Sequence, residues 1–364
     1  MKRTDVRPGS APPLPPVEPI RLVDPDGRRV SDPAYTAPDH GTLLALLRAM
    51  IIGRRFDRQA SALTRQGRLA VYPSSYGQEA CQVGGVLALA DNDWLFPTYR
   101  DSVSLVTRGV DPIEVLTLLR GDWHSGYDPE RHRCAPQCTP LATNASHAVG
   151  LTYAARRKGE DTAALVLMGD GATSEGDAHE AYNFAAVWNT PVVFLIQNNH
   201  WAISVPVHKQ SVAPTLAHKA IGYGMRGHHV DGNDAAAVHA VVSHALAEAR
   251  AGSGPAIIEA RTYRMGPHTN SDAPQRYRDD SEVEYWKERD PLARLERLLR
   301  DEGRIDDSEL ERIRAQADRL AATMRERLSA AGRLAPEELF SHVYASTPAL
   351  LARQRQELLD ELEA

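Results

Sequence analysis

The 364-residue sequence predicts an α/β fold with a doubly wound, mostly parallel sheet. Two short apolar runs, at 163–169 and 191–197, have the continuous hydrophobicity of parallel strands that are buried on both faces. A segment with helical periodicity separates them, so the three form a βαβ unit. Two further strand candidates, at 227–232 and 255–266, flank another predicted helix. This alternation of strands and helices is typical of a doubly wound sheet.

Three segments of different composition divide the chain. Residues 1–40 hold nine of the 24 prolines, which disfavour helices and central strands, so we expect an extended arm. Residues 41–280 form the predicted α/β domain, which begins with a helix of about 25 residues that ends near Gly67. Residues 281–364 are rich in Glu and Arg, with leucines at helical spacing, and predict a helical C-terminal appendage.

Between residues 78 and 121 the pattern predicts two helices, QEACQVGGVLALA and DPIEVLTLLRG. The aromatic segment DWLFPTYRDS joins them, and we expect it to be a loop that carries Tyr99 and Arg100. No strand is predicted in this part of the chain.

Composition excludes several classes of function. With 42 basic and 48 acidic side chains the net charge is -6, which gives no electrostatic reason to expect a nucleic acid as partner. The longest apolar runs are far shorter than the roughly 20 residues that cross a bilayer, so we expect no membrane span. The N-terminus lacks the apolar core of a signal peptide, and three cysteines fit a reducing compartment. We therefore expect a cytoplasmic protein.

One cluster of potential zinc ligands needs separate consideration. His124, His132, Cys134 and Cys138 lie close together in the sequence. The C-x₃-C spacing is looser than the usual C-x₂-C pair, and the sequence has no second pair. A zinc site is therefore not expected.

The most specific signal lies at the ends of the first two central strands. GDGATSEG, residues 169–176, follows one strand, and QNN, residues 197–199, follows the next. Because ligands of open parallel sheets bind at the carboxyl ends of the strands, Asp170 and Asn199 are expected to lie side by side. A carboxylate and a carboxamide are hard oxygen ligands that suit Mg²⁺. The sequence thus predicts a magnesium site here.

The same segment predicts an anion site. Gly169 and Gly171 let the backbone approach a phosphate, and a helix with Ser174 as its N-cap would point its amino end at the anion. The alternative, that both segments are merely turns, is weakened because the two occur together. A nicotinamide fingerprint needs a different glycine spacing, and a P-loop needs a Gly-Lys-Ser/Thr ending, which is missing here. The prediction is a diphosphate held with magnesium.

Gly-Asp-Gly, 26 residues and then Asn-Asn resembles the signature of proteins that bind thiamine diphosphate. The wider sequence resembles the alpha subunit of the thiamine diphosphate-dependent decarboxylating component of 2-oxo acid dehydrogenase complexes, of the pyruvate and branched-chain type. The resemblance implies the thiamine diphosphate-binding fold and runs from about residue 40 to the C-terminus, so that the Pro-rich arm lies outside it. Six motifs in order carry it: YPSSYGQEA, FPTYRDS, TPLAT, GDGATSEGDAHEAYNFA, QNNHWAIS and YRMGPHTNSD.

The resemblance implies roles for individual residues. Mg²⁺ would be bound by the side chains of Asp170 and Asn199 and by the backbone carbonyl of Trp201. Tyr99 and Arg100 would hold the diphosphate, as suits a phenol and a guanidinium. His268 would lie in the reaction space, where an imidazole can handle protons. The other residues implied to contact the cofactor are Leu141, against the aminopyrimidine, Gly169, Gly171 and Ala172, and, as a weaker candidate, Arg264.

Two positions in the matching motifs carry further implications. Gln197 stands where some branched-chain members have an arginine near the diphosphate, which puts the full set of diphosphate ligands in doubt. Thr269 and Ser271 lie in a loop that is phosphorylated in some relatives, but one sequence gives no evidence of a kinase, so we predict no such control.

The resemblance implies oxidative decarboxylation of a 2-oxo acid and reductive acyl transfer to the lipoyl domain of an acyltransferase core. Thiamine chemistry also needs a buried glutamate from a second α/β domain, and residues 281–364 do not predict one. Glu79 and Glu175 are the in-chain alternatives, but we expect both to be hydrated among polar residues. We therefore expect a beta subunit to supply the glutamate in a tetramer of two alpha and two beta chains.

Two alternative functions remain open from the sequence. Within the family, the chain could cleave acetoin instead of a 2-oxo acid. From a different class, it could be a non-catalytic Mg²⁺-nucleotide-binding or assembly protein with the same fold.

Overall fold

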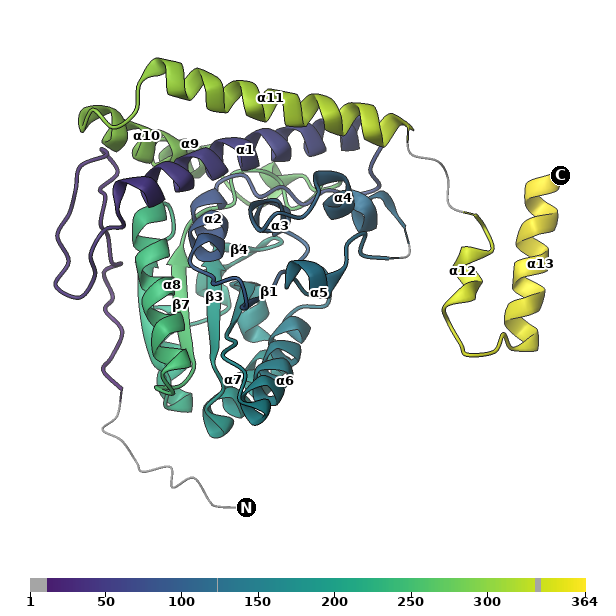
Figure 1. Ribbon diagram of the computed structural model, residues 1–364, viewed down its shortest axis with the longest axis horizontal. Helices are drawn as coiled ribbons and strands as arrows, with labels where there is room; N and C mark the ends of the chain where they lie inside the picture. The colour runs from purple at the N-terminus through teal and green to yellow at the C-terminus, as the bar shows by residue number, and fades with distance from the viewer. Residues whose placement is uncertain (1–11, 123, 331–334) are drawn as a thin grey trace.

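A computed structural model of the chain describes residues 12–122, 124–330 and 335–364. Its centre is a five-stranded sheet with helices on both faces, so the α/β prediction is confirmed (Figure 1). Every pairing within this sheet is parallel. In spatial order, the strands are β1 (Trp94–Phe96), β2 (Ala164–Gly169), β3 (Val192–Asn198), β7 (Ala256–Arg261) and β6 (Arg226–Asp231).

The apolar runs form the two central strands. All seven residues of β3 are buried, as the continuous hydrophobicity of 191–197 predicts. The register pairs Gly169 at the end of β2 with Gln197 near the end of β3. Asp170 and Asn199 each follow the last residue of their strand, so both lie at the carboxyl edge of the sheet.

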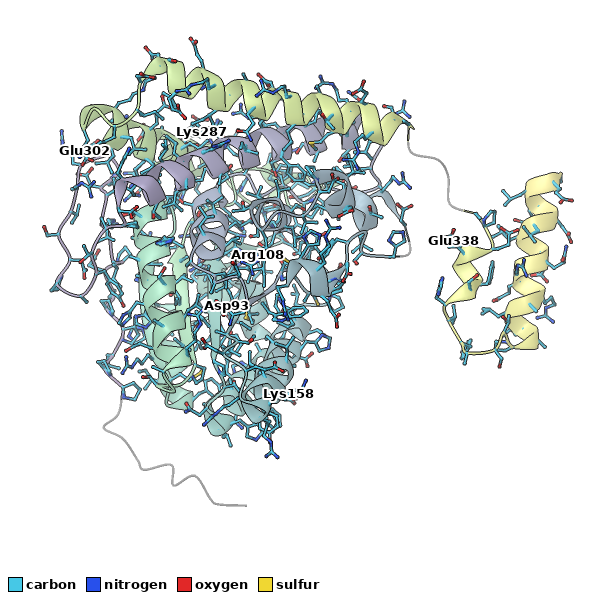
Figure 2. All side chains as sticks on the ribbon, viewed as in Figure 1. Asp93, Arg108, Lys158, Lys287, Glu302 and Glu338 are labelled. Atoms are coloured by element: carbon cyan, nitrogen blue, oxygen red, sulfur yellow. The ribbon has the colours of Figure 1, made fainter. Side chains whose placement is uncertain are left out.

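Strand β1 is the element that the sequence did not predict. It has three residues and lies inside the segment expected to be a loop, where so short a run shows no detectable periodicity. Asp93 is fully buried directly before it and accepts hydrogen bonds from the backbone of Ala90 and Ala163. The Arg108 guanidinium donates to the Asp93 carbonyl at 2.9 Å, and both residues lie within the body (Figure 2). Tertiary contacts therefore form this strand.

Each face of the sheet has its own helical layer. One core joins alternate strand residues such as Leu165 and Leu195 to helices α1, α2 and α8. A second core joins Val166 and Phe194 to helices α6 and α7. These helices are α1 (His40–Arg65), α2 (Glu79–Leu87), α8 (Ala235–Arg250), α6 (Thr143–Lys158) and α7 (Gly176–Trp188).

Helix α7 begins later than predicted. Its N-cap is Glu175, and Ser174 instead belongs to the 3₁₀ helix η1 (Gly171–Ser174). This turn forms because the carbonyl of Asp170 accepts hydrogen bonds from Thr173 N at 3.1 Å and Thr173 Oγ1 at 2.8 Å. The prediction that Ser174 caps the helix was wrong, but the amino end of α7 still faces the carboxyl edge of the sheet.

Helix α1 starts as predicted, with the Asp39 carboxylate accepting from Thr42 N at 2.8 Å. It packs lengthwise against α11 (Asp307–Ala330), which forms the outermost layer (Figure 1). The remaining helices are α3 (Ser102–Thr107), α4 (Pro112–Arg120), α5 (Pro129–His132), α9 (Asp280–Lys287), α10 (Pro291–Asp301), α12 (Glu338–Ser341) and α13 (Ala349–Glu363), and a short hairpin joins β4 (Trp201–Ala202) to β5 (Val205–Pro206).

Extra segments pair with both edges of the sheet. Ile20 forms a parallel bridge with Val230 of β6, and it exchanges hydrogen bonds with His229 and Asp231 at 2.9 and 3.0 Å. At the other edge, Leu95 of β1 pairs with Cys134. Residues outside the regular strands therefore satisfy part of the backbone at each edge.

The arm and the appendage share the main core with the α/β domain. Leu22 of the arm and Leu298 and Leu310 of the appendage are each 3% exposed or less and belong to the core that contains α1. The division of the chain at residues 40 and 280 stays a prediction, and the first eleven residues of the arm lie outside the described residues. Helices α12 and α13 lie apart from the body in Figure 1. Among the described residues, no helix has the length and apolarity needed to span a membrane.

Candidate functional site

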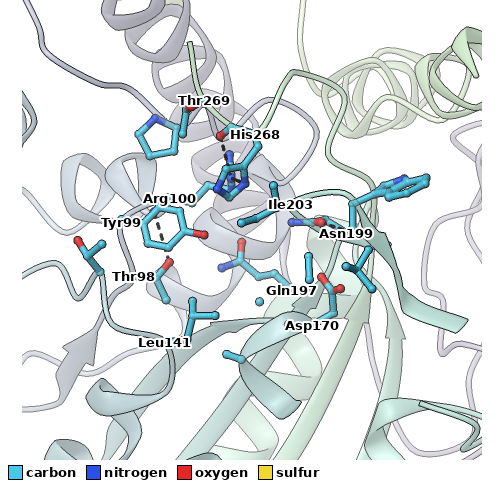
Figure 3. Close-up of a pocket in the computed structure, with 18 of the residues that line it drawn as sticks. Thr98, Tyr99, Arg100, Leu141, Asp170, Gln197, Asn199, Ile203, His268 and Thr269 are labelled. Carbon is cyan, nitrogen blue, oxygen red and sulfur yellow. Dashed lines mark hydrogen bonds between the residues drawn. The ribbon is translucent and has the colours of Figure 1, made fainter. Parts of the chain in front are cut away.

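A cavity of about 780 Å³ lies at the carboxyl edge of the sheet (Figure 3). Strand ends form its floor, and loops from the first and last thirds of the α/β region form its upper wall. Of the eleven residues that the sequence predicted for the site, ten line this cavity: Tyr99, Arg100, Leu141, Gly169, Asp170, Gly171, Ala172, Asn199, Trp201 and His268. The eleventh, Arg264, does not appear in its lining.

Asp170 and Asn199 meet on the floor of the cavity, as Figure 3 shows. They are only 1% and 5% exposed. Burial raises the pKa of Asp170, although Gln210 Nε2 donates to its Oδ2 at 2.8 Å and partly offsets that effect. A bound cation would stabilise the ionised carboxylate. Two oxygen donors on adjacent strand ends therefore fit Mg²⁺.

Gly171 keeps the backbone of this edge close to the β4–β5 hairpin. A Cβ at position 171 would lie 2.7 Å from the Cβ of Ala202, closer than two carbon atoms can approach. Glycine at this position therefore preserves the narrow part of the cavity beside Asp170, where the predicted diphosphate would lie.

Arg264 lies behind the cavity wall. Its side chain is 1% exposed and donates to the carbonyl oxygens of Trp201 at 3.3 Å and Ile203 at 2.8 Å, and to the Tyr277 hydroxyl at 2.7 Å. Burial lowers the pKa of Arg264 to about 10. Since Ile203 has a left-handed φ of 56°, these bonds hold a strained turn in place. The cavity lining therefore does not support direct contact between Arg264 and a cofactor.

Arg100 and His268 form the upper wall. One Arg100 nitrogen lies 3.0 Å from His268 Nδ1 and 3.0 Å from the His268 carbonyl, and the other donates to the Ser74 carbonyl at 2.9 Å. A guanidinium can only donate, so Nδ1 accepts and the neutral ring carries its proton on Nε2. Burial, together with Arg100 and Arg264, lowers the pKa of His268 to about 4. His268 is therefore a neutral hydrogen-bond donor near pH 7.

Tyr99 and Leu141 complete the side walls. The Tyr99 ring lies edge-on to His268, with 6.0 Å between ring centroids, and its backbone nitrogen donates to the Cys138 carbonyl at 3.2 Å. The loop that carries Tyr99 is fixed by Asp101, whose Oδ2 accepts from both the backbone and the hydroxyl of Thr98 at 2.7 Å. Leu141 is 38% exposed, so it offers an apolar surface to a ligand.

Several residues of the cavity lie outside the predicted site. Gln78, Ile203, Lys209 and Gln210 all line it, and none belongs to the predicted strand-end motifs. Gln210 contacts a residue 40 positions away in the sequence, so no local pattern could have indicated it. Gln197 also lines the cavity, where its side chain bonds to Asp101 and Gln78.

The expectation that Glu79 is hydrated was wrong. Its side chain is fully buried, lies 2.6 Å from Arg54 Nε and accepts from Gly77 N at 3.0 Å. Helix α2 packs inside the body, which the polar residues around position 79 did not indicate. Glu79 is absent from the cavity lining, whereas Glu175 is exposed, as expected, and lies on the cavity rim.

The cysteines show no arrangement for zinc. Within the described parts of the chain, no three His, Cys, Asp or Glu side chains are grouped closely enough to hold a metal ion. The Cys134 and Cys138 thiols lie against the carbonyls of His132 and Pro140, at 3.4 and 3.1 Å. Burial raises the pKa of both thiols, which disfavours the thiolate that zinc needs.

Comparison with known proteins identifies the family. A sequence model of the dehydrogenase E1 component matches residues 47–336. The chain belongs to the dehydrogenase E1 component family. It is 46% identical over 348 residues to the 3-methyl-2-oxobutanoate dehydrogenase subunit alpha of Mycobacterium tuberculosis, covering 95% of each chain.

A second group of relatives is more distant. The chain is 38% identical over 308 residues to the pyruvate dehydrogenase E1 component subunit alpha of Staphylococcus aureus, covering 84% of this chain and 83% of that one. The resemblance to alpha subunits of the decarboxylating component of 2-oxo acid dehydrogenase complexes is thereby confirmed.

Proposed function

We propose that this E1 alpha chain binds thiamine diphosphate with Mg²⁺ and, together with a beta subunit, decarboxylates a branched-chain 2-oxo acid in the cytoplasm. The acyl group would pass reductively to a lipoyl domain of the acyltransferase core. The observation that carries the proposal is the cavity itself, which brings the strand-end oxygens of Asp170 and Asn199 together with Tyr99, Arg100 and His268.

The floor and the upper wall of the cavity carry groups that would bind the diphosphate from opposite sides. Asp170, Asn199 and the Trp201 carbonyl would hold Mg²⁺ on the floor. Arg100 and Tyr99 would bind phosphate oxygens from the opposite side, and the backbone at Gly169, Gly171 and Ala172 would approach the same group. Thiamine diphosphate, when bound, supplies the carbanion chemistry of decarboxylation.

His268 is the residue of this chain that we assign to proton handling. Its Nδ1 accepts from Arg100, which leaves the Nε2 proton free to face a bound substrate. Because its pKa is lowered to about 4, the ring stays neutral at working pH and donates a hydrogen bond instead of adding a charge. Leu141 would pack against the aminopyrimidine.

Exposed apolar side chains at the cavity support the need for a partner. Leu141, Ile203 and Val205 line it and are 38%, 56% and 43% exposed. Apolar groups at the mouth of a site are stabilised when another chain covers them. The same chain would bring the glutamate that thiamine chemistry requires, because Glu79 is already paired with Arg54 inside the body. Two alpha and two beta subunits would form the working tetramer.

Two observations favour a branched-chain substrate over pyruvate. The relative named for 3-methyl-2-oxobutanoate is 46% identical, against 38% for the pyruvate dehydrogenase relative. Near Arg100 the cavity has a wall of Val71, Pro73 and Leu119, an apolar surface that would bury additional methyl groups of a substrate.

The test is co-expression with the beta subunit, followed by turnover assays on 3-methyl-2-oxobutanoate, pyruvate and acetoin. We expect 3-methyl-2-oxobutanoate to have a kcat/KM at least about tenfold above that of pyruvate, because its additional methyl groups would contribute binding free energy in the apolar part of the cavity. The purified alpha chain alone should turn over nothing. Higher activity on pyruvate or acetoin would contradict the substrate assignment.

A failure of all three substrates with the beta subunit present would contradict the function itself. Thermal shifts would then separate the remaining classes of protein. Stabilisation by Mg²⁺ with a nucleotide, and none by thiamine diphosphate, would indicate a nucleotide-binding or assembly protein.

A further inference from the structure

A chain of buried amide side chains links a carboxylate to the predicted metal ligand Asn199. Asp101 Oδ1 accepts from Gln197 Nε2 at 2.7 Å, and Gln197 Oε1 accepts from Gln78 Nε2 at 3.0 Å. Gln78 Oε1 in turn accepts from Asn199 Nδ2 at 2.7 Å. All four side chains are 5% exposed or less, so water does not compete for these bonds. We call these four residues the amide relay.

The relay has a direction. Burial raises the pKa of Asp101, but the hydrogen bonds from Gln197 Nε2 and from the Thr98 backbone N–H and hydroxyl favour its ionised form, in which both oxygens accept. Gln197 must therefore turn its NH₂ group toward Asp101 and its oxygen toward Gln78. Gln78 must then turn its NH₂ group to Gln197 and its oxygen to Asn199. Each amide fixes the orientation of the next.

The last member of the relay presents its oxygen to the cavity. Because Asn199 Nδ2 is bound to Gln78, Asn199 Oδ1 points away from Gln78 and accepts from Trp201 N at 3.2 Å. This oxygen has a second lone pair that can bind a ligand. The two ends of a carboxamide have nearly the same size, so packing alone does not select this orientation. A flipped Asn199 would present N–H groups to the cation and lose a ligand.

We propose that Gln78 is a positioning residue that orients the Asn199 oxygen toward Mg²⁺, acting through the amide relay from Asp101. This inference rests on the proposed magnesium and diphosphate site. It also gives Gln197 a role that an arginine could not fill, because a guanidinium has no acceptor to offer to Gln78.

The test compares two variants of the assembled alpha and beta tetramer. Gln78→Met has a similar length but no amide donor or acceptor, so Asn199 loses the shorter of the two hydrogen bonds that select its orientation and keeps only the one from Trp201 N. Gln78→Glu loses the donor to Gln197 Oε1, which retains its bond from Gln82 Nε2, but it keeps an acceptor for Asn199 Nδ2 and should restore the Asn199 orientation. Thiamine diphosphate binding is measured by calorimetry at increasing Mg²⁺ concentration. We expect the half-saturating Mg²⁺ concentration to rise at least tenfold in Gln78→Met and less than threefold in Gln78→Glu.

Gln82 provides a matched control. It lies one helical turn along α2, is fully buried, and donates to the Arg100 backbone carbonyl at 3.1 Å and to Gln197 Oε1 at 3.3 Å. No hydrogen bond joins Gln82 to Asn199, both of which lie in the described part of the chain. Gln82→Met should therefore shift the Mg²⁺ requirement less than threefold. Equal shifts in Gln78→Met and Gln82→Met would overturn the proposal, as would a wild-type requirement in Gln78→Met.

A double-variant cycle separates the loss of Asn199 orientation from a general disturbance of the site by Gln78→Met. An aspartate at position 199 presents an oxygen in either orientation, so Asn199→Asp removes the need for the relay. The additional effect of Gln78→Met in this background should then vanish. A full, additive effect would contradict the relay. If wild-type binding of thiamine diphosphate does not depend on Mg²⁺ at all, the proposed site fails, and this outcome is distinct from a failure of the relay alone.

Discussion

The two ends of the cavity are built in different ways. At the sheet end, Asp170 and Asn199 directly follow strands whose register is fixed by the parallel sheet. At the loop end, Arg100 and His268 come from loops 168 residues apart in the sequence, and they hold each other by side-chain hydrogen bonds. The buried Asp170 carboxylate dominates the sheet end, whereas the Arg100 guanidinium and the neutral His268 ring lie at the loop end. We infer that the sheet end gives cofactor affinity, to which Arg100 adds from the loop end, and that His268 gives rate.

The largest expected effect is on rate, at the loop end. His268→Ala removes the Nε2 proton donor, so turnover should fall by about 10² to 10⁴, the usual contribution of a general acid or base. Cofactor affinity should change less than threefold, because the diphosphate ligands remain. Turnover is measured with an artificial electron acceptor and with a lipoyl domain. Asn270→Ala, in the same loop and exposed, is the control. Unchanged turnover with both acceptors would remove His268 from the reaction.

At the sheet end the expected effect is on affinity. Asp170→Asn should weaken thiamine diphosphate binding by at least tenfold, or about 1.4 kcal/mol, because the carboxylate ligand of Mg²⁺ is lost. Chelation of Mg²⁺ should have the same effect on the wild-type tetramer. Calorimetry on the assembled enzyme measures both. Asp177→Asn changes a nearby exposed acid in the first turn of α7 and serves as the control. Wild-type affinity in Asp170→Asn would contradict the assignment of cofactor affinity to the sheet end.

The smallest expected effect is a difference in the pH dependence of stability. The pKa of His268 is lowered to about 4 in the folded chain, from an ordinary value of 6.5. Between these values the unfolded ring binds a proton and the folded ring does not, so stability falls as the pH is lowered from 6.5 toward 4. His268→Gln should lose less stability over this interval than wild type. Thermal melting at pH 7, 6 and 5 measures the difference, since the buried acids are common to both proteins. An equal fall in melting temperature with pH in wild type and His268→Gln would argue against a neutral His268.

The sheet end was predictable because its signals are local. Asp170 and Asn199 directly follow apolar runs, and a parallel sheet places such residues at one edge whatever the rest of the chain does. The loop end followed only from the family resemblance, since no periodicity relates Arg100 to His268. The amide relay was not predictable at all, because its hydrogen bonds join residues 96 to 121 positions apart.

Two expectations, for Glu79 and for β1, were wrong because tertiary contacts outweighed the local sequence. Polar side chains were taken as a sign of hydration at Glu79, yet the ion pair with Arg54 lets that carboxylate lie fully inside the body. The three residues of β1 were assigned to a loop, yet parallel pairing with β2 makes them a strand, and the buried Asp93 beside them bonds to the backbone of Ala163. In both cases a contact with residues distant in the sequence determined the outcome.

The pairing at the two margins of the sheet limits how this chain can assemble. An open parallel sheet would leave rows of backbone donors and acceptors available to a strand of another molecule. Here Ile20 occupies part of the β6 margin, and Pro19 beside it has no N–H to offer to a further strand. Cys134 takes a similar place beside β1 and is followed by Pro136. Part of each sheet margin is thereby unavailable to a strand of another molecule.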